Sequence, residues 1–250
     1  MRVAKRLGWY GMMVMVSGSS GPARLYADWL NSVFELIPTH RADSGLSILC
    51  LGAHSDDIEI GCGGTILRLL QTAQCRVTWV VLSATGPRRL EAFASARRFL
   101  KGAKSTAIVT KQFKESFFPY HGEAIKEFFE RLKRRCAPDL VFTHYRDDLH
   151  QDHRIVCELT WNTFRQHHIL EYEIPKYDGD LGRPNVYVPL PEDLCNAKVK
   201  YLLEGFPTQR NKHWFTEDTF YSLLRLRGIE SFAPDKYAEA FYGRKLVLGG

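Results

Sequence analysis

The chain has 250 residues, 45% of them hydrophobic and 25% charged, which are the proportions of an ordinary soluble globular protein and exclude wholesale disorder. The length favours one domain with one sizeable core. The formal charge is +6, but no nucleic-acid-binding motif accompanies the scattered basic residues, so we expect no nucleic-acid partner. We interpret these residues as solvated helix faces, with contact to an anionic substrate or a membrane surface as the alternative.

The cysteines are widely spaced, form no Cys-x-x-Cys pair, and in several cases lie inside apolar runs. This is the pattern of reduced, buried thiols in a cytosolic protein, so we expect a cytoplasmic location. The six are Cys50, Cys62, Cys75, Cys136, Cys157 and Cys195.

Residues 1–45 are predicted to form an N-terminal extension that precedes a single domain, residues 46–250. Residues 1–16 have a basic start and an apolar run too short to span a bilayer. A signal peptide or a peripheral anchor stays open as an alternative for this segment. Residues 26–37 have the pattern of an amphipathic helix, and residues 38–45 that of a linker.

The most informative stretch is residues 48–65. Residues 47–53 are nearly all apolar, as in a strand at the centre of a parallel sheet, and residues 63–74 have the pattern of a helix. We therefore place His54–Asp57 on the loop at the carboxyl end of the strand, where open α/β sheets bind ligands. His and Asp three residues apart can direct a nitrogen and an oxygen to one point, which suits zinc. The alternative is an Asx-rich turn that caps the following helix.

Strand and helix patterns alternate along the rest of the first two thirds of the chain. Predicted strands at residues 76–83, 105–110 and 139–143 alternate with predicted helices at residues 88–100, 123–135 and 154–165. This βα alternation predicts a mostly parallel sheet with helices on both faces, an α/β fold.

A second cluster of histidine and aspartate follows the predicted strand 139–143. Because parallel strands end at one edge of the sheet, this cluster and His54–Asp57 can meet there although about a hundred residues separate them. The sequence therefore predicts a metal site at that edge. The cluster consists of His144, Asp147, Asp148, His150, Asp152 and His153, of which the first three are candidates only for lining the pocket.

The last third of the chain is less regular. Residues 170–189 contain several Gly and Pro and predict a loop and an edge strand beside the site. Helices are predicted at residues 191–203 and 216–226, and a last short strand at residues 245–248.

Residues 53–65 and 150–153 together resemble the PIG-L/LmbE-like family of zinc-dependent N-deacetylases. The resemblance covers about residues 46–165, and each motif follows a predicted strand. It implies a Rossmann-like α/β fold with the active site at the carboxyl ends of the strands. It also implies hydrolysis of an N-acetyl group on an amino sugar, carried by a glycan, nucleotide-sugar or glycolipid precursor.

The resemblance also implies residue roles. His54, Asp57 and His153 would be the metal ligands, leaving an open position for water as a catalytic zinc requires; another divalent ion is the alternative. Asp56 would then act as the general base. His150, when protonated, would stabilise the developing oxyanion.

Two further residues receive roles by the resemblance or by the local pattern. Arg88, three residues before Glu91, matches an Arg-x-x-Glu pattern that family members place near sugar hydroxyls; the alternative is a solvated residue at a helix start. Asp152 is predicted to orient a neighbouring histidine, with a helix N-cap as the alternative.

The chain departs from the family pattern at three positions. Ser55 and Gln151 stand where the family usually has Pro, and Ile58 stands where it often has Glu. None of these removes a predicted ligand or the base.

Other functions were weighed against the deacetylase. The glycines of residues 61–64 have the wrong spacing and position for a dinucleotide-binding fingerprint. A non-catalytic metal-binding module is disfavoured because both Asp56 and His150 are present. An amide hydrolase acting on a non-sugar N-acyl amine stays open, as does the oligomeric state. The sequence favours an enzyme, a zinc-dependent sugar N-deacetylase.

Overall fold

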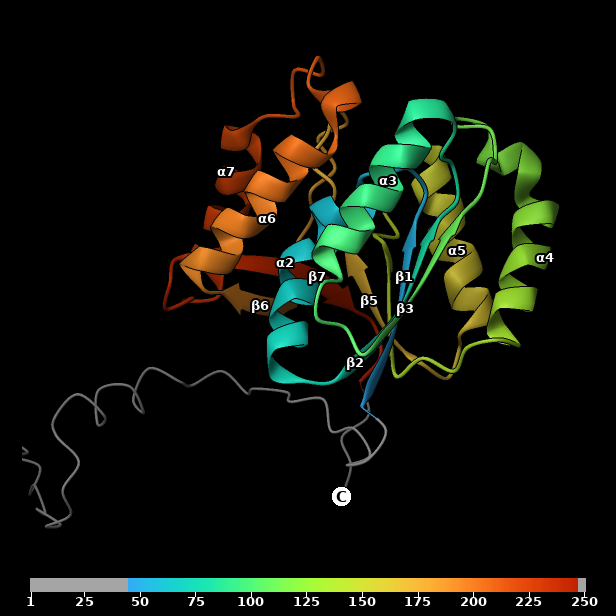
Figure 1. The fold of residues 1–250 in the computed structure, drawn as a ribbon, viewed down its shortest axis with the longest axis horizontal. Coiled ribbons are helices and arrows are strands. Elements are labelled where there is room, and N and C mark those ends of the chain that lie inside the picture. Colours follow the sequence, from blue (N-terminus) through green and yellow to red (C-terminus); the bar gives the residue numbers. More distant parts are fainter. Residues whose placement is uncertain (1–44, 247–250) are drawn as a thin grey trace, which may run out of the picture. The chain divides into compact units, whose positions relative to one another are not determined.

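The computed structural model describes residues 45–246, which form a seven-stranded sheet in the order β3-β2-β1-β4-β5-β7-β6 with helices packed on it (Figure 1). The strands are β1 (Leu46–Gly52), β2 (Cys75–Val81), β3 (Ser105–Thr110), β4 (Leu140–His144), β5 (His168–Tyr172), β6 (Val186–Leu190) and β7 (Tyr237–Gly243). The helices are α2 (Asp57–Thr72), α3 (Gly86–Phe99), α4 (Gly122–Lys133), α5 (Gln151–Thr163), α6 (Glu192–Gly205) and α7 (Glu217–Glu230), with short 3-10 helices η1 (Phe118–His121) and η2 (Pro207–Gln209).

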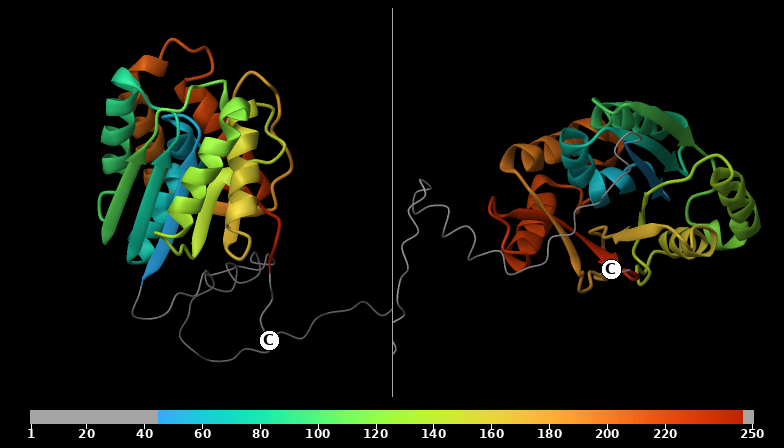
Figure 2. Two further views of the ribbon diagram at one scale, coloured as in Figure 1. Left: turned by 90° about the vertical axis from the view of Figure 1, so that its right-hand side faces the viewer. Right: turned by 90° about the horizontal axis from the view of Figure 1, so that it is seen from below.

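The sheet has the topology that βα alternation predicts. Strands β3, β2, β1, β4 and β5 are parallel, whereas β7 is antiparallel to β5 and β6 is antiparallel to β7. Helices α2, α3, α6 and α7 lie on one face and α4 and α5 on the other, as Figures 1 and 2 show. The predicted α/β fold is confirmed. The chain turns to opposite sides of the sheet after β1 and β4, so the two strands flank the position where such folds bind ligands.

Strand β1 is buried on both faces of the sheet. Ile48 and Cys50 belong to the core under α2 and α3, whereas Leu49 and Leu51 belong to the core under α4 and α5. Successive side chains of a strand point to opposite faces. This explains why β1 appears in the sequence as a continuous apolar run.

Two helices begin earlier than the sequence predicts. Helix α2 begins at Asp57, not at residue 63, and α5 begins at Gln151, not at residue 154. The glycines at residues 61, 63 and 64 lie within α2, where neighbouring side chains pack against its backbone: a Cβ at Gly61 would lie 2.2 Å from Cδ2 of Tyr172. Asp57 and His153 therefore belong to first helical turns, not to loops.

The prediction for the end of the chain was wrong. The last strand is β7, whereas residues 244–246 have no regular structure and residues 247–248 lie outside the described part. Strand β7 contains two alanines around Glu239, residues of low strand propensity. Strand β6 is the expected edge strand. The predictions for residues 1–44 also lie outside the described residues, so the domain boundary stays a prediction.

Two general properties of the described residues bear on the sequence predictions. All six cysteines are free. Within residues 45–246, no helix has the length and apolar character needed to cross a membrane.

Candidate metal and active site

The two polar clusters meet at the carboxyl edge of the sheet. Strands β1 and β4 are neighbours, so the residues that follow them share that edge. His54 follows β1 and His153 lies in the first turn of α5, and their Nδ1 and Nε2 atoms are 3.1 Å apart across 99 residues of sequence. Both side chains are nearly inaccessible to solvent.

Three predicted ligands surround one point. His54 Nδ1 lies 3.4 Å from Asp57 Oδ2, and His153 Nε2 lies 3.6 Å from Asp57 Oδ1. The outer nitrogens of both rings are bonded to carboxylates, His54 Nε2 to Asp152 Oδ2 at 3.1 Å and His153 Nδ1 to Asp148 Oδ2 at 2.9 Å. A carboxylate on the outer nitrogen leaves the lone pair of the inner nitrogen directed inward.

This arrangement requires a cation. Two inward lone pairs repel one another at 3.1 Å unless a proton or metal ion lies between them. Zn–N bonds of about 2.0–2.1 Å at tetrahedral angles put ligand atoms roughly 3.3 Å apart, close to the three separations given above. The donor set therefore fits zinc.

The charges of the site agree with a requirement for a cation. Burial alone would lower the pKa of His54, but Asp57 and Asp152 outweigh it and raise the pKa to about 10. Burial alone would raise the pKa of Asp57, but His153, His54 and His144 hold it well below its usual range. A proton on His54 thus supplies the positive charge, and binding of a metal would release it.

His144 is closer to the ligands than the sequence predicted. It ends β4 and is fully buried; its Nε2 lies 3.1 Å from Asp57 Oδ2 and 3.0 Å from Ala53 N. Its ring stacks on that of His153 with centroids 3.9 Å apart. Asp57, His144 and His153 form one group that could hold an ion, and His54, His150 and His153 form another. The sequence signal for His144 was the position of this residue at the end of a predicted strand.

His150 lies at the rim of the cluster as the N-cap of α5. Its Nδ1 accepts a hydrogen bond from Asp152 N at 3.2 Å, so the proton of the neutral ring is on Nε2. Burial, and then the charge of His54, lower its pKa. The lowered pKa favours the neutral ring over the protonated one expected from the resemblance, and the neutral ring still carries an N–H on Nε2.

Asp56 has a free carboxylate oxygen. The residue is the N-cap of α2 but makes no side-chain cap bond, and its buried Oδ2 has no hydrogen-bond partner among the described residues. Burial and the adjacent Asp57 raise its pKa, whereas Arg88 opposes the rise. A carboxylate with a raised pKa and an open oxygen is suited to accept a proton.

Arg88 lies beside Asp56. Its NH2 atom is 3.6 Å from Asp56 Oδ1, and its NH1 donates to Glu115 at 2.5 Å. The alternative of a purely solvated Arg88 is therefore wrong. Glu91 faces elsewhere, accepting hydrogen bonds from Thr208 N at 3.0 Å and Thr208 Oγ1 at 2.6 Å.

Asp152 fixes a neighbouring loop as well as His54. Besides His54 Nε2, its carboxylate accepts hydrogen bonds from Ser116 N at 2.6 Å and Phe118 N at 3.1 Å. The N-cap alternative for Asp152 is wrong, because His150 is the N-cap. Gln151, at one of the departures from the family pattern, donates to Ser116 O of the same loop.

Some contacts of the site carried no sequence signal. Asp148 is buried and binds Lys176, whose Nζ lies 3.1 Å away. Lys176 follows β5, far from either motif. Asp147, predicted with Asp148 as a pocket-lining candidate, is instead exposed and accepts a bond from Tyr145 Oη at 3.1 Å. At the other departures, Ser55 and Ile58 are both fully buried.

Comparison with known proteins gives a family match for part of the chain. Residues 49–164 match the family described as PIG-L: GlcNAc-PI de-N-acetylase. The two motifs and the strands that precede them lie almost entirely within this match. The match contains all the residues predicted for the site from sequence, whereas Lys176 and strands β5–β7 lie beyond it.

Solved structures similar to this chain include enzymes of more than one kind. The N,N'-diacetylchitobiose deacetylase of Pyrococcus horikoshii is 22% identical with a TM-score of 0.61, the match covering 90% of this chain and 94% of that one. The A40926 pseudoaglycone deacetylase Dbv21 is 17% identical, TM-score 0.61, covering 78% and 96%. GalB, the 4-carboxy-2-hydroxymuconate hydratase of Pseudomonas putida KT2440, is 15% identical, TM-score 0.60, covering 82% and 98%. These matches establish the fold, and a fold supports several reactions.

Proposed function

We propose that this protein is a zinc-dependent hydrolase that removes the N-acetyl group from an amino sugar in a glycan, nucleotide-sugar or glycolipid precursor. The observation that carries the proposal is the convergence of His54, His153 and Asp57 around one point, with the open carboxylate of Asp56 beside it. The family match to a GlcNAc-PI de-N-acetylase supports the N-acetyl substrate, as does the fold shared with the N,N'-diacetylchitobiose deacetylase and the A40926 pseudoaglycone deacetylase.

His54, Asp57 and His153 would hold the ion. Zinc bound there supplies a Lewis acid for the acetyl carbonyl and lowers the pKa of a bound water towards neutrality. The outer carboxylates Asp152 and Asp148 hold the two imidazoles in the tautomers that ligation requires. Three protein ligands leave a position open, as in catalytic zinc sites.

Asp56 moves the proton. It takes a proton from the attacking water through its free Oδ2 and passes it to the departing nitrogen when the C–N bond breaks, so that acetate and a free amine leave the site. Its raised pKa favours the first of these transfers, in which the carboxylate accepts the proton. Arg88, in contact with Asp56, is the residue we propose for binding a sugar hydroxyl.

His150 stabilises negative charge on the carbonyl oxygen. Its neutral ring keeps one N–H on Nε2, since Nδ1 accepts from the backbone. A donor aimed at a developing oxyanion contributes about 3 kcal/mol in comparable sites. This role does not require protonation of the ring.

The test combines metal analysis with a screen for acetate release across N-acetyl amino sugars and N-acetyl amines that lack a sugar. We expect Asp56→Asn to retain zinc while acetate release falls by roughly 10²–10⁴-fold, whereas His54→Ala loses zinc. Asp147→Asn, at an exposed position three residues after the end of β4, is the matched control and should retain both properties. Undiminished activity of Asp56→Asn refutes the mechanism, and full zinc content in His54→Ala refutes the ligand assignment. Preference for sugar-free amines would instead favour the non-sugar amide hydrolase.

A further inference from the structure

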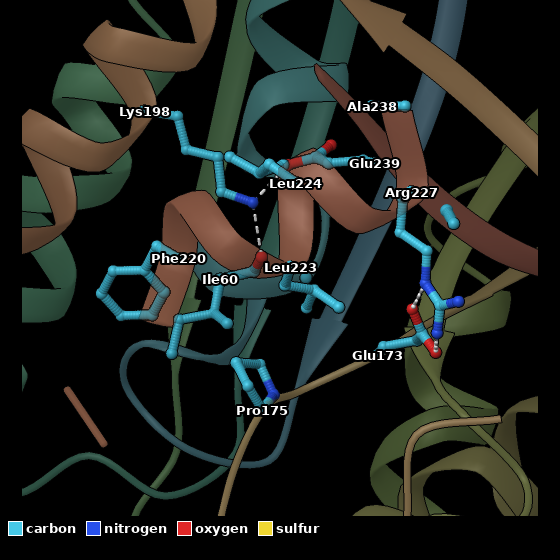
Figure 3. A pocket seen from close by; sticks show the side chains of 12 residues that line it. Ile60, Glu173, Pro175, Lys198, Phe220, Leu223, Leu224, Arg227, Ala238 and Glu239 are labelled. Carbon is cyan, nitrogen blue, oxygen red and sulfur yellow. Dashed lines mark hydrogen bonds and ion pairs between the residues drawn. The ribbon is translucent and has the colours of Figure 1, made fainter. Parts of the chain in front are cut away.

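A buried ion pair from the last third of the chain contacts the backbone of helix α2. Lys198 of α6 and Glu239 of β7 are each only 3% exposed. Lys198 Nζ donates to Glu239 Oε1 at 2.5 Å and to the carbonyl oxygen of Ile60 at 2.6 Å. Glu239 in turn accepts from Gly64 N at 2.8 Å and from Thr65 N at 2.6 Å. Figure 3 shows Lys198 reaching both the Ile60 carbonyl and Glu239.

The ion pair bonds to backbone groups of two successive turns of the helix. The carbonyl of Ile60 and the N–H of Gly64 are four residues apart, the spacing of partners in a regular α-helix. Here Ile60 O accepts a hydrogen bond from Lys198, Lys198 bonds to Glu239, and Gly64 N donates to Glu239. Residues of α6 and β7 therefore hold the backbone of the first turn of α2 and of the turn that follows it.

Glycine makes this approach possible. A Cβ at Gly64 would lie 3.0 Å from Glu239 Oε1 and 2.5 Å from Leu190 Cδ1, so a larger residue would push the carboxylate away from the helix backbone. The glycine of the family-like motif thus has a physical reason in this chain. It gives the carboxylate access to two consecutive backbone N–H groups.

The ion pair is not placed to bind a ligand. The cavity beside it has a volume of about 20 Å³, room for one water molecule. Apolar side chains, among them Phe220 and Leu224, line much of it (Figure 3). A buried ion pair also does not stabilise a fold more than apolar groups of the same size do, because both charges lose their hydration. A conformational role accounts for its presence better than either alternative.

The first turn of α2 carries the predicted ligand Asp57. Its carboxylate lies 3.4 Å from His54 Nδ1 and 3.6 Å from His153 Nε2, so a small change in the direction of this turn displaces it from both histidines. We propose that Lys198 and Glu239 are positioning residues of the metal site, which hold the first turn of α2 so that Asp57 faces His54 and His153. This inference rests on the proposed metal site. Both residues lie outside the PIG-L match of residues 49–164.

A second buried ion pair provides a matched control. Arg227 and Glu173 line the same cavity and bond to each other at 2.9 and 2.6 Å. In the described part of the chain, the other hydrogen bonds of this pair go to β7, α7 and the loop at Gly182, not to α2. The test variant is Lys198→Met with Glu239→Gln, and the control is Arg227→Met with Glu173→Gln, both in the full chain.

Two measurements decide the proposal. The first is the zinc dissociation constant, measured by competition with a chelator; we expect roughly a 10- to 100-fold weakening in the test variant and an affinity close to wild type in the control. The second is the set of backbone amide NMR shifts of Asp57, Ile58 and Glu59 in metal-free protein. These should move in the test variant and stay in place in the control.

The outcomes separate this inference from the proposed function. Unchanged zinc affinity and unchanged amide shifts in the folded test variant overturn it, and so does an equal loss in the control. If the double variant does not fold, Lys198→Arg, which keeps a donor for Ile60, should retain the affinity that Glu239→Gln loses; equal affinities overturn the proposal. If wild-type protein binds no zinc, the proposed metal site fails, and the amide shifts still test the positioning.

Discussion

Replacing Asp152 by asparagine tests how the site is held together. The carboxylate of Asp152 is fully buried and accepts three hydrogen bonds, from His54 Nε2 and Ser116 N on Oδ2 and from Phe118 N on Oδ1. An asparagine oxygen can take the place of Oδ2 and keep two of these bonds. The amide nitrogen then faces Phe118 N–H, so one donor points at another.

The number of hydrogen bonds lost and weakened sets the expected loss in the free energy of unfolding. A lost hydrogen bond to a charged group costs roughly 1.5–3 kcal/mol, and the two surviving bonds weaken because charge-assisted bonds are about twice as strong as neutral ones. We expect a total loss of about 3 kcal/mol, which lowers the melting temperature by roughly 6–12 °C for a domain of this size. Because His54 also loses its anionic partner, zinc affinity should fall roughly 10- to 100-fold.

Thermal melts of metal-free Asp152→Asn and wild-type protein measure the first effect, and chelator competition measures the second. Asp147→Asn is the control, since this exposed carboxylate should change stability by less than about 0.5 kcal/mol. A melting temperature of Asp152→Asn within about 2 °C of wild type would show that the three bonds do not hold the loop and the histidine as described.

Two further predictions concern pH and packing. Metal-free protein should be most stable near pH 6.5. The pKa of His54 is raised to about 10, so its contribution to stability is complete below pH 6.5 and is lost as pH rises. The pKa of His153 is lowered by burial to about 3, so stability falls as pH drops below 6.5. Melts at about pH 5, 6.5 and 8.5 should show a slope of up to about 1.4 kcal/mol per pH unit on each side, and a flat profile contradicts the assigned environments. Gly61→Ala should destabilise by about 1–3 kcal/mol or more because its Cβ would lie 2.2 Å from Tyr172. Gly122→Ala, whose Cβ meets nothing within 4 Å, should be neutral or slightly stabilising in the same denaturant titration, and equal losses at the two glycines would contradict the packing argument.

The sequence was most informative where one physical signal dominated. Burial on both faces made β1 a continuous apolar run, and parallel topology made it possible to infer that His54 and His153 meet without knowing any angle. The predicted strand at residues 105–110 coincides with β3. Strands β1 to β4 and the meeting of the two polar clusters at their carboxyl ends could therefore be predicted from local patterns together with one topological rule.

The sequence was least informative where distant residues decide local structure. Helix α2 begins before its predicted start, and Tyr172, Phe99 and Glu239 pack against its backbone at the glycines. Strand β7 was not predicted, because a charged residue at a buried strand position, Glu239, is explained only by the helix that Glu239 contacts. The roles inferred from the family for ligands, base and oxyanion donor stay predictions for the experiments above.

The position of β5, β7 and β6 limits how this protein can be shortened. A chain ending at residue 164, where the PIG-L match ends, would retain both motifs. It would lack β5, so the five residues Leu140–His144 of β4 would lose their pairing partner and form an exposed edge of the sheet. Exposed apolar edges recruit other chains and aggregate. Fusion or transplantation of the catalytic segment should therefore carry the sheet through Gly243, because the shorter piece would fail by misassembly before its chemistry could be assayed.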